Sequence, residues 1–218
     1  MARRALTTTT AAFATTAALL LTACGGSDDK SSDDIKGADK GSNSPSASAS
    51  ATTGGNGPDL GLPKDFKLVF DFDKPSDAKH AAALADAQNY VRAMYHGIVA
   101  QDPEDPAYQY YSDAQGAQYV KSQIQAAVKG GWTITGTDKY YDAETTTLSG
   151  GKRVLVTFCE NQAKAYSKEI KTGKVLRAEE NPDSYLKQRL LMVPSSGSPQ
   201  IWKVQVIEVL GKAKECQA

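Results

Sequence analysis

The chain has 218 residues, and its 25 Lys and Arg balance its 25 Asp and Glu to a formal net charge of zero. No basic patch interleaved with aromatic residues stands out, which argues against nucleic acid as a partner. Two histidines and three cysteines, in spacings that match no zinc motif, predict neither a metal site nor another cofactor.

The first 23 residues have the pattern of a secretory signal peptide. A positive start at Met1–Arg4 is followed by the uncharged segment Ala11–Leu21, which at about eleven residues is far shorter than the roughly 20 of a membrane-spanning helix. The end of this segment, Leu21-Thr22-Ala23-Cys24, resembles the lipobox of bacterial lipoproteins. That resemblance implies that the Cys24 thiol receives a diacylglyceryl group and that cleavage occurs before Cys24.

The lipobox also predicts where the protein resides. Two acyl chains hold a protein on a bilayer, where one chain would be marginal. We therefore expect the protein at the outer face of the cytoplasmic membrane, in the cell envelope, with the lipid bilayer as a partner through acylated Cys24. An ordinary signal peptide with an incidental cysteine is the alternative, and the export route stays open.

Residues 24–58 are predicted to be a disordered linker. Apart from Ile35 the segment consists almost wholly of small and polar residues, which cannot bury enough apolar surface to offset the entropy lost on ordering. A flexible chain of roughly 34 residues reaches about 30–35 Å, enough to hold a domain clear of lipid headgroups. The aspartates of this segment lack the glycine and glutamate of a calcium loop, so we interpret them as solvated: Asp28, Asp29, Asp33 and Asp34.

After the linker, the chain opens with a strand and two helices. Asp65–Asp73 alternates apolar and polar residues, as in a strand or extended segment with one buried face. Ser76–Gln101 carries an apolar stripe at three- and four-residue spacing, which predicts a helix. A second helical stretch is expected to begin near Pro106, to break at Ser112 and to end at Gly130-Gly131.

From Trp132 onward the apolar period changes to two, which predicts antiparallel strands. In the last of them Trp202, Val204 and Val206 are expected on one face, opposite Ile201, Ile207 and Val209. The order predicts one α+β domain, residues 59–218, with N-terminal helices packed on a curved antiparallel sheet of about four strands. The expected strands run from Trp132 to about Tyr141, from Lys152 to about Tyr166, from Asp183 to Val193 and from Gln200 to Leu210.

Cys159 and Cys216 are predicted to pair. An export signal implies an oxidising compartment, in which two cysteines tend to form a disulfide. The bridge would close a loop of roughly 57 residues and stabilise the fold by about 4 kcal/mol in the chain-entropy model. Two unpaired thiols, with Cys159 buried and Cys216 in a frayed tail, are the alternative.

The order of elements resembles the nuclear-transport-factor-2-like cone fold over about Asp77 to Cys216. More narrowly, the chain resembles a group of secreted actinobacterial lipoproteins of unknown function, which share the two late cysteines and bring no known activity. The segments that carry this second resemblance are KLVFDF (67–72), DAQNYVRAM (86–94), TGTDKYYD (135–142), VTFCENQAKAYSKEIKTGKV (156–175) and KAKEC (212–216).

Enzymes on the cone fold, such as ketosteroid isomerases and polyketide cyclases, place an aspartate base and a tyrosine or second acid in a pocket between sheet and helices. The resemblance implies that polar residues of the predicted elements could form such a site, although none of them falls in a motif of those families. The residues available are Tyr90, Tyr95, His96, Asp138, Tyr140, Tyr141, Glu160 and Arg189.

Glu160 and His96 are the catalytic candidates. Glu160 follows Val154, Val156 and Phe158 at period two, so it shares their face. Lining the cone, Glu160 would be a buried acid or base with a raised pKa; at a strand end that has left the core it would be solvated, and we favour the second interpretation. His96 lies near the end of the first predicted helix, where an imidazolium suits the helix dipole, so we favour a structural role for it.

Tyrosine is abundant, and an apolar ring with a hydroxyl suits contact with a ligand or partner. The ligand-binding candidates are Tyr95, Tyr140, Arg189 and Trp202, while GxSxG, HExxH, CxxC and phosphate-binding glycine motifs are missing from the sequence. We therefore expect a membrane-anchored extracytoplasmic module, monomeric or homodimeric, that binds a cell-envelope ligand or protein without catalysis. One alternative is a small isomerase- or cyclase-type enzyme with its site in the cone. Another is a domain whose cone is filled by its own side chains and which acts through its surface.

Overall fold

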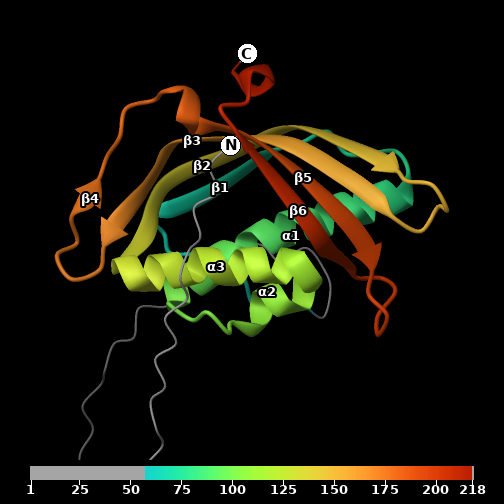
Figure 1. The fold of residues 1–218 in the computed structure, drawn as a ribbon, viewed down its shortest axis with the longest axis horizontal. Coiled ribbons are helices and arrows are strands. Elements are labelled where there is room, and N and C mark those ends of the chain that lie inside the picture. The colour runs from blue at the N-terminus through green and yellow to red at the C-terminus, as the bar shows by residue number, and fades with distance from the viewer. Residues whose placement is uncertain (1–56, 218) are drawn as a thin grey trace, which may run out of the picture. The chain divides into compact units, whose positions relative to one another are not determined.

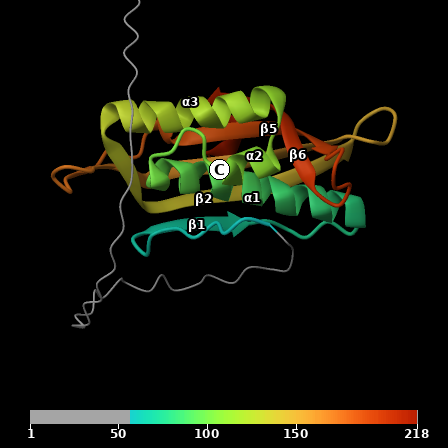
Figure 2. The same cartoon turned by 90° about the horizontal axis from the view of Figure 1, so that it is seen from below.

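The computed structural model describes residues 57–217, and the predicted signal peptide, Cys24 and all but the end of the predicted linker lie outside them. The described residues form an α+β domain in which three helices lie on one side of the sheet (Figures 1 and 2). The α+β class predicted from the sequence is thus confirmed. Within residues 57–217 no helix is both long and apolar enough to cross a membrane.

The sheet of this domain is mixed and has six strands. Their order is β1-β2-β3-β5-β6, with the two-residue β4 beside β3. β1 runs parallel to β2, and the other neighbours are antiparallel. The strands are β1 (Phe66–Asp71), β2 (Trp132–Thr147), β3 (Val154–Glu169), β4 (Val175–Leu176), β5 (Tyr185–Pro194) and β6 (Trp202–Gly211).

The prediction of an antiparallel sheet of about four strands is therefore wrong in strand number and in one strand direction. All three helices lie in the chain between β1 and β2, and this long connection allows the two strands to run the same way. An alternating pattern identifies a strand but does not reveal a partner so distant in sequence. β4 is too short to produce a pattern at all.

The first two helices begin at residues that cap helices well. α1 (Ala78–Ala100) follows Asp77, whose carboxylate accepts the N–H of His80 at 2.9 Å. α2 (Pro106–Tyr111) has Asp105 as its N-cap and proline in its first turn. The two helices are separated by the proline-containing break that the sequence predicts.

The third helix, α3 (Ala114–Gly130), is separated from α2 by Ser112 and Asp113, so the interruption predicted at Ser112 is confirmed. It ends at Gly131, which has a left-handed backbone with φ of 66°. Glycine adopts this conformation without the steric cost that a Cβ would bring.

The core lies between the sheet and the helices. α1 contacts α2, α3, β2 and β6, so most of its circumference is buried. Each large apolar side chain removed from water stabilises the fold by about 1.5–3 kcal/mol. Fully buried examples come from every layer: Val91, Val120, Ile124, Val154, Val156, Phe158, Leu190, Met192 and Val204.

β6 contains a β-bulge that the sequence pattern does not reveal. Leu191 pairs with Val206, but the next residue of β5 pairs with Val204, so Gln205 is an extra residue in β6. The bulge reverses the alternation, and Val206 is exposed whereas Ile207 is buried. The prediction that Val206 shares the face of Val204 is therefore wrong.

The outer edge of β6 is covered by the start of α3. The Gln115 side chain accepts the N–H of Ile207 at 2.7 Å and donates to its carbonyl oxygen at 3.2 Å. The N–H of Asp113 donates to the carbonyl oxygen of Val204 at 3.0 Å. A Cβ on Gly116 would lie 2.3 Å from that same oxygen, so the approach requires glycine. These contacts occupy backbone groups through which an edge strand would otherwise pair with another chain.

Candidate functional site

Two carboxyl side chains, those of Asp138 on β2 and Glu160 on β3, are buried in the core. They are 0% and 3% exposed, although aspartate and glutamate are among the residues least often found inside proteins. Tyr140 lies two residues after Asp138 on the same face and directly opposite Glu160 across the strand pair. We call the group formed by Asp138, Glu160, Tyr95, Tyr140 and Gln188 the acid cluster.

Hydrogen bonds connect the acid cluster across α1, β2, β3 and β5. The hydroxyls of Tyr95 and Tyr140 both donate to Oδ2 of Asp138, each at 2.7 Å. The side-chain amide of Gln188 donates to Oε2 of Glu160. The second oxygen of Asp138, Oδ1, has no hydrogen-bond partner among the residues that the structure describes.

Burial governs protonation in the acid cluster. It raises the pKa of Asp138 to about 6, although the hydroxyls of Tyr140 and Tyr95 favour the ionised carboxylate. Burial also raises the pKa of Glu160 well above its usual range, and the negative charge of Asp138 raises it further. Burial raises the pKa of Tyr95 and of Tyr140 well above the usual range, so both hydroxyls stay protonated and remain donors.

The helices close the acid cluster on the side away from the sheet. Tyr95 comes from α1, and its ring packs on that of Phe66 with centroids 4.8 Å apart. Tyr119 of α3 is half-buried, and burial together with the charge of Glu160 raises its pKa to about 12. Tyr119 therefore belongs to the electrostatic surroundings of Glu160 on the helix side of the sheet.

Neither of two grooves on the surface of the domain is lined by a residue of the acid cluster. The first, of about 390 Å³, lies between α2 and the β5–β6 connection, with Tyr110, Ile201 and Lys203 in its walls. The second, of about 290 Å³, we call the Ile170 groove. It is lined by Pro63, Asp65, Val99, Gln101, Thr133, Ile134, Lys168 and Ile170. Within residues 57–217 no group of three His, Cys, Asp or Glu side chains is arranged to hold a metal ion.

Glu160 is the predicted site residue whose environment differs most from expectation. The favoured interpretation, a solvated strand end, is wrong, because β3 continues to Glu169 and has neighbours on both sides at this point. Glu160 pairs with Tyr140 of β2 and with Leu186 of β5. The cover comes from these flanking strands and from the helices, and the β3 sequence alone does not show it.

The other candidates divide between the acid cluster and separate locations. Tyr95 and Tyr140 converge on the cluster, whereas Arg189 lies on the surface and forms an ion pair of 3.0 Å with Glu208. The Trp202 ring is buried, and its backbone N–H donates to Oδ2 of Asp86 at 2.8 Å. Gln188 is not among the residues predicted from the sequence, although it lies at period two between Leu186 and Leu190 and so shares their face.

His96 connects two helices and lies outside the acid cluster. Its Nδ1 is 2.7 Å from Oδ2 of Asp105, the buried N-cap residue of α2. The other oxygen of Asp105 accepts the N–H of Ala107 at 2.7 Å. The contacts of His96 therefore fix the turn between α1 and α2, in keeping with the structural role favoured from the sequence.

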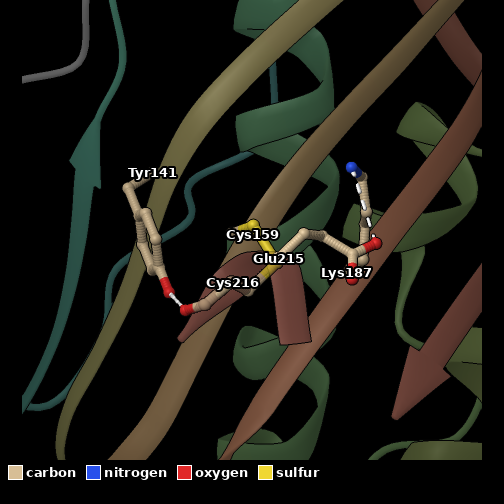
Figure 3. The surroundings of a disulfide bond; sticks show 5 residues. All are labelled: Tyr141, Cys159, Lys187, Glu215 and Cys216. Atoms are coloured by element: carbon tan, nitrogen blue, oxygen red, sulfur yellow. Dashed lines mark hydrogen bonds and ion pairs between the residues drawn. A yellow bond between two sulfur atoms is a disulfide. The ribbon is translucent and has the colours of Figure 1, made fainter. Parts of the chain in front are cut away.

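The disulfide between Cys159 and Cys216 lies on the outer face of the sheet, with the two Cα atoms 5.5 Å apart (Figure 3). Tyr141 donates its hydroxyl to the carbonyl oxygen of Cys216. The side chains of Lys187 and Glu215 form an ion pair of 3.8 Å nearby. These contacts join the C-terminal turn, Lys214–Cys216, to three strands of the sheet.

Comparison with known proteins gives little beyond this geometry. No protein-family model matches the chain, and a search of curated proteins finds no similar sequence. One solved structure that the chain matches is the crystal structure of the intermembrane space region of the chloroplast protein ARC6. The two are 15% identical, the match covers 63% of this chain and 98% of that one, and the TM-score is 0.38.

Proposed function

We propose that the chain is a membrane-anchored lipoprotein of the cell envelope whose domain binds a ligand or a partner without catalysis. The observation that carries the second half of this proposal is the closed acid cluster. Catalysis needs ionisable groups that a substrate can reach, and the grooves described above do not include these groups. The first half rests on the lipobox at Leu21–Cys24, which lies outside the described residues.

We also propose that the domain is of the nuclear-transport-factor-2-like cone type. The support is the order of elements, with the three helices before the long strands β2, β3, β5 and β6, and the placement of those helices on one face of the sheet. In this domain the space between sheet and helices is occupied by the domain's own side chains. A filled interior supports the third expectation from the sequence, and that the domain acts through its surface is part of this proposal.

The Ile170 groove is the surface on which we place recognition. Ile170 is 49% exposed, and Val99 and Ile134 line the same groove, so it presents apolar area to solvent. Asp65 and Lys168 form an ion pair of 3.0 Å in its wall and supply polar contacts. A groove of this kind suits an apolar group of an envelope component, with polar atoms bonded at the rim.

The experiment compares two surface variants of the full chain. Ile170→Asp places a charge in the groove, and Leu210→Asp places the same charge on an equally exposed apolar residue of β6. Envelope material captured by the wild-type chain should be lost with Ile170→Asp and retained with Leu210→Asp. Equal capture by both variants would remove the groove from the proposal, and capture of nothing by the wild type would contradict the binding function.

An enzyme of isomerase or cyclase type is the alternative, and one observation favours it. Two carboxyl groups and two tyrosine hydroxyls converge in the interior, which is the kind of constellation such chemistry needs. It would require the helices to move and uncover the acid cluster. Turnover of a small substrate that is lost in both Asp138→Asn and Glu160→Gln, but kept in Ile170→Asp, would favour the enzyme.

A further inference from the structure

The two oxygens of the Asp138 carboxyl group are unequally provided with donors. Oδ2 accepts two hydroxyl groups, each at 2.7 Å. Oδ1 is buried and has no partner among residues 57–217. Because an unpaired polar atom inside a protein loses its bonds to water without replacement, a donor is expected at Oδ1.

Among the side chains of the acid cluster, Glu160 is the remaining source of that donor, while the backbone N–H of Lys139 also favours the ionised Asp138. Tyr95 of α1 and Tyr140 of β2 already donate to Oδ2, and Gln188 of β5 donates to Oε2 of Glu160. The Glu160 carboxyl group lies directly opposite Tyr140 on the same buried face and interacts with that of Asp138. An ionised carboxyl group can only accept hydrogen bonds, whereas a protonated one can also donate, so Glu160 can supply the missing bond only with a proton attached.

Within residues 57–217 no ion pair offsets the charge of the two carboxyl groups. Neither Asp138 nor Glu160 takes part in the ion pairs formed within the described part of the chain. The titratable neighbour on α3, Tyr119, is an acid itself and brings no positive charge. Two adjacent carboxylates in an apolar interior repel strongly, and a shared proton removes that repulsion.

We propose that Asp138 and Glu160 form a binding site for a single proton, which Glu160 carries at neutral pH and donates to Oδ1 of Asp138. Asp138 is then the ionised partner and accepts three hydrogen bonds, from Tyr95, Tyr140 and Glu160. The Gln188 amide holds the other oxygen of Glu160 and orients the carboxyl group for donation. The site needs neither the lipid anchor nor the Ile170 groove, so it goes beyond the proposed function.

A proton held in this way makes the fold more stable in acid. The unfolded chain releases the Glu160 proton near the ordinary pKa of glutamate, whereas the folded chain keeps it. The stabilising effect is complete below that ordinary pKa and is lost as pH rises, by about tenfold in the folding equilibrium per pH unit, until the raised pKa of Glu160 is passed. The raised pKa of Asp138 likewise makes the fold lose stability as pH rises to about 6.

The test compares the full chain with its Glu160→Gln variant by urea unfolding between pH 6.5 and 8.5. A glutamine at 160 can donate to Oδ1 of Asp138 and accept from Gln188 as the protonated glutamate does, but it has no proton to lose. The stability of the variant relative to the wild type should therefore increase with pH, by up to about tenfold in the folding equilibrium per pH unit while the folded wild type keeps the Glu160 proton. Glu144→Gln, an exposed change on β2, should follow the wild type at every pH.

Parallel pH profiles for the wild type and Glu160→Gln would overturn the proposal. A second measurement covers the case in which the variant does not fold. Carbon-13 NMR of the glutamate carboxyl groups in the folded wild-type chain at pH 7 should show Glu160 protonated and the exposed Glu144 ionised. A Glu160 signal typical of an ionised carboxylate would equally overturn the proposal.

Discussion

Cys159 and Glu160 are neighbours on β3 that point to opposite faces of the sheet. On the inner face Glu160 joins the acid cluster, and on the outer face Cys159 is bonded to Cys216. The C-terminal turn lies on the side of the sheet away from the helices (Figure 1). The disulfide therefore braces from outside the same stretch of β3 that carries the buried carboxyl group.

Breaking the disulfide should destabilise the domain. The bridge joins positions 57 residues apart, so it limits the freedom of the unfolded chain. For Cys216→Ser we expect a loss of about 2–4 kcal/mol and a melting temperature lower by about 5–15 °C. Scanning calorimetry of the wild type and the variant measures the difference. A reductant should lower the melting temperature of the wild type and leave that of Cys216→Ser unchanged. A wild-type melting temperature that is the same with and without reductant would argue against a structural bridge.

The lipid anchor can be tested at one atom. Cys24→Ala removes the only thiol of the predicted lipobox, so metabolic labelling with a palmitate analogue should be lost, and the protein should leave the membrane fraction. Cys216→Ser is the matched control, since it removes a cysteine outside the lipobox and should keep the label. Labelling that survives Cys24→Ala, or a mature N-terminus at another residue, would contradict the anchor.

Helix boundaries could be predicted from the sequence because they depend on local chemistry. The cap at Asp77, the proline at Pro106 and the left-handed exit at Gly131 each act within one turn of helix. The pairing of β1 with β2 and the extra residue Gln205 in β6 depend instead on distant neighbours. The spacing of apolar residues does not reveal either feature. The predictions of the strand number and of the faces of β6 were wrong for this reason.

The site was partly predictable, because the face on which a strand residue lies depends on local alternation. Period two places Glu160 on the face of Phe158, and the same rule applied to β2 and β5 places Asp138 beside Tyr140 and Gln188 beside Leu190. The pattern does not show how far along β3 the flanking strands and the helices bury its residues. The burial of Glu160 follows from strands on both sides and helices above, so only the assembled fold distinguishes a buried acid from a solvated one.

Gln115 is predicted to stabilise the domain and to protect the edge of β6 from pairing with another chain. Gln115→Ala would leave the N–H and carbonyl oxygen of Ile207 without the bonds that its side chain provides, at a cost of about 1 kcal/mol. The uncovered edge should also favour association between chains, visible as a concentration-dependent shift in size-exclusion chromatography. Gln118→Ala, on the exposed face of the same helix, should change neither stability nor size. An effect of equal size from both variants would remove this role from Gln115.

The two tyrosines of the acid cluster should differ from ordinary buried tyrosines in the pH dependence of their variants. Tyr95→Phe or Tyr140→Phe removes one donor to Oδ2 of Asp138 and so weakens the ionised form only. The folded-state pKa of Asp138 should therefore rise above about 6, and stability should be lost as pH rises through that range. We expect each variant to lose about 1–3 kcal/mol at pH 8, and less at pH 5, where Asp138 is protonated. Urea unfolding at the two pH values measures this difference.

Tyr119→Phe, which alters a hydroxyl on α3 that does not bond to Asp138, is the control. A loss of stability independent of pH in Tyr95→Phe and Tyr140→Phe would mean that their hydroxyls do not stabilise an ionised Asp138.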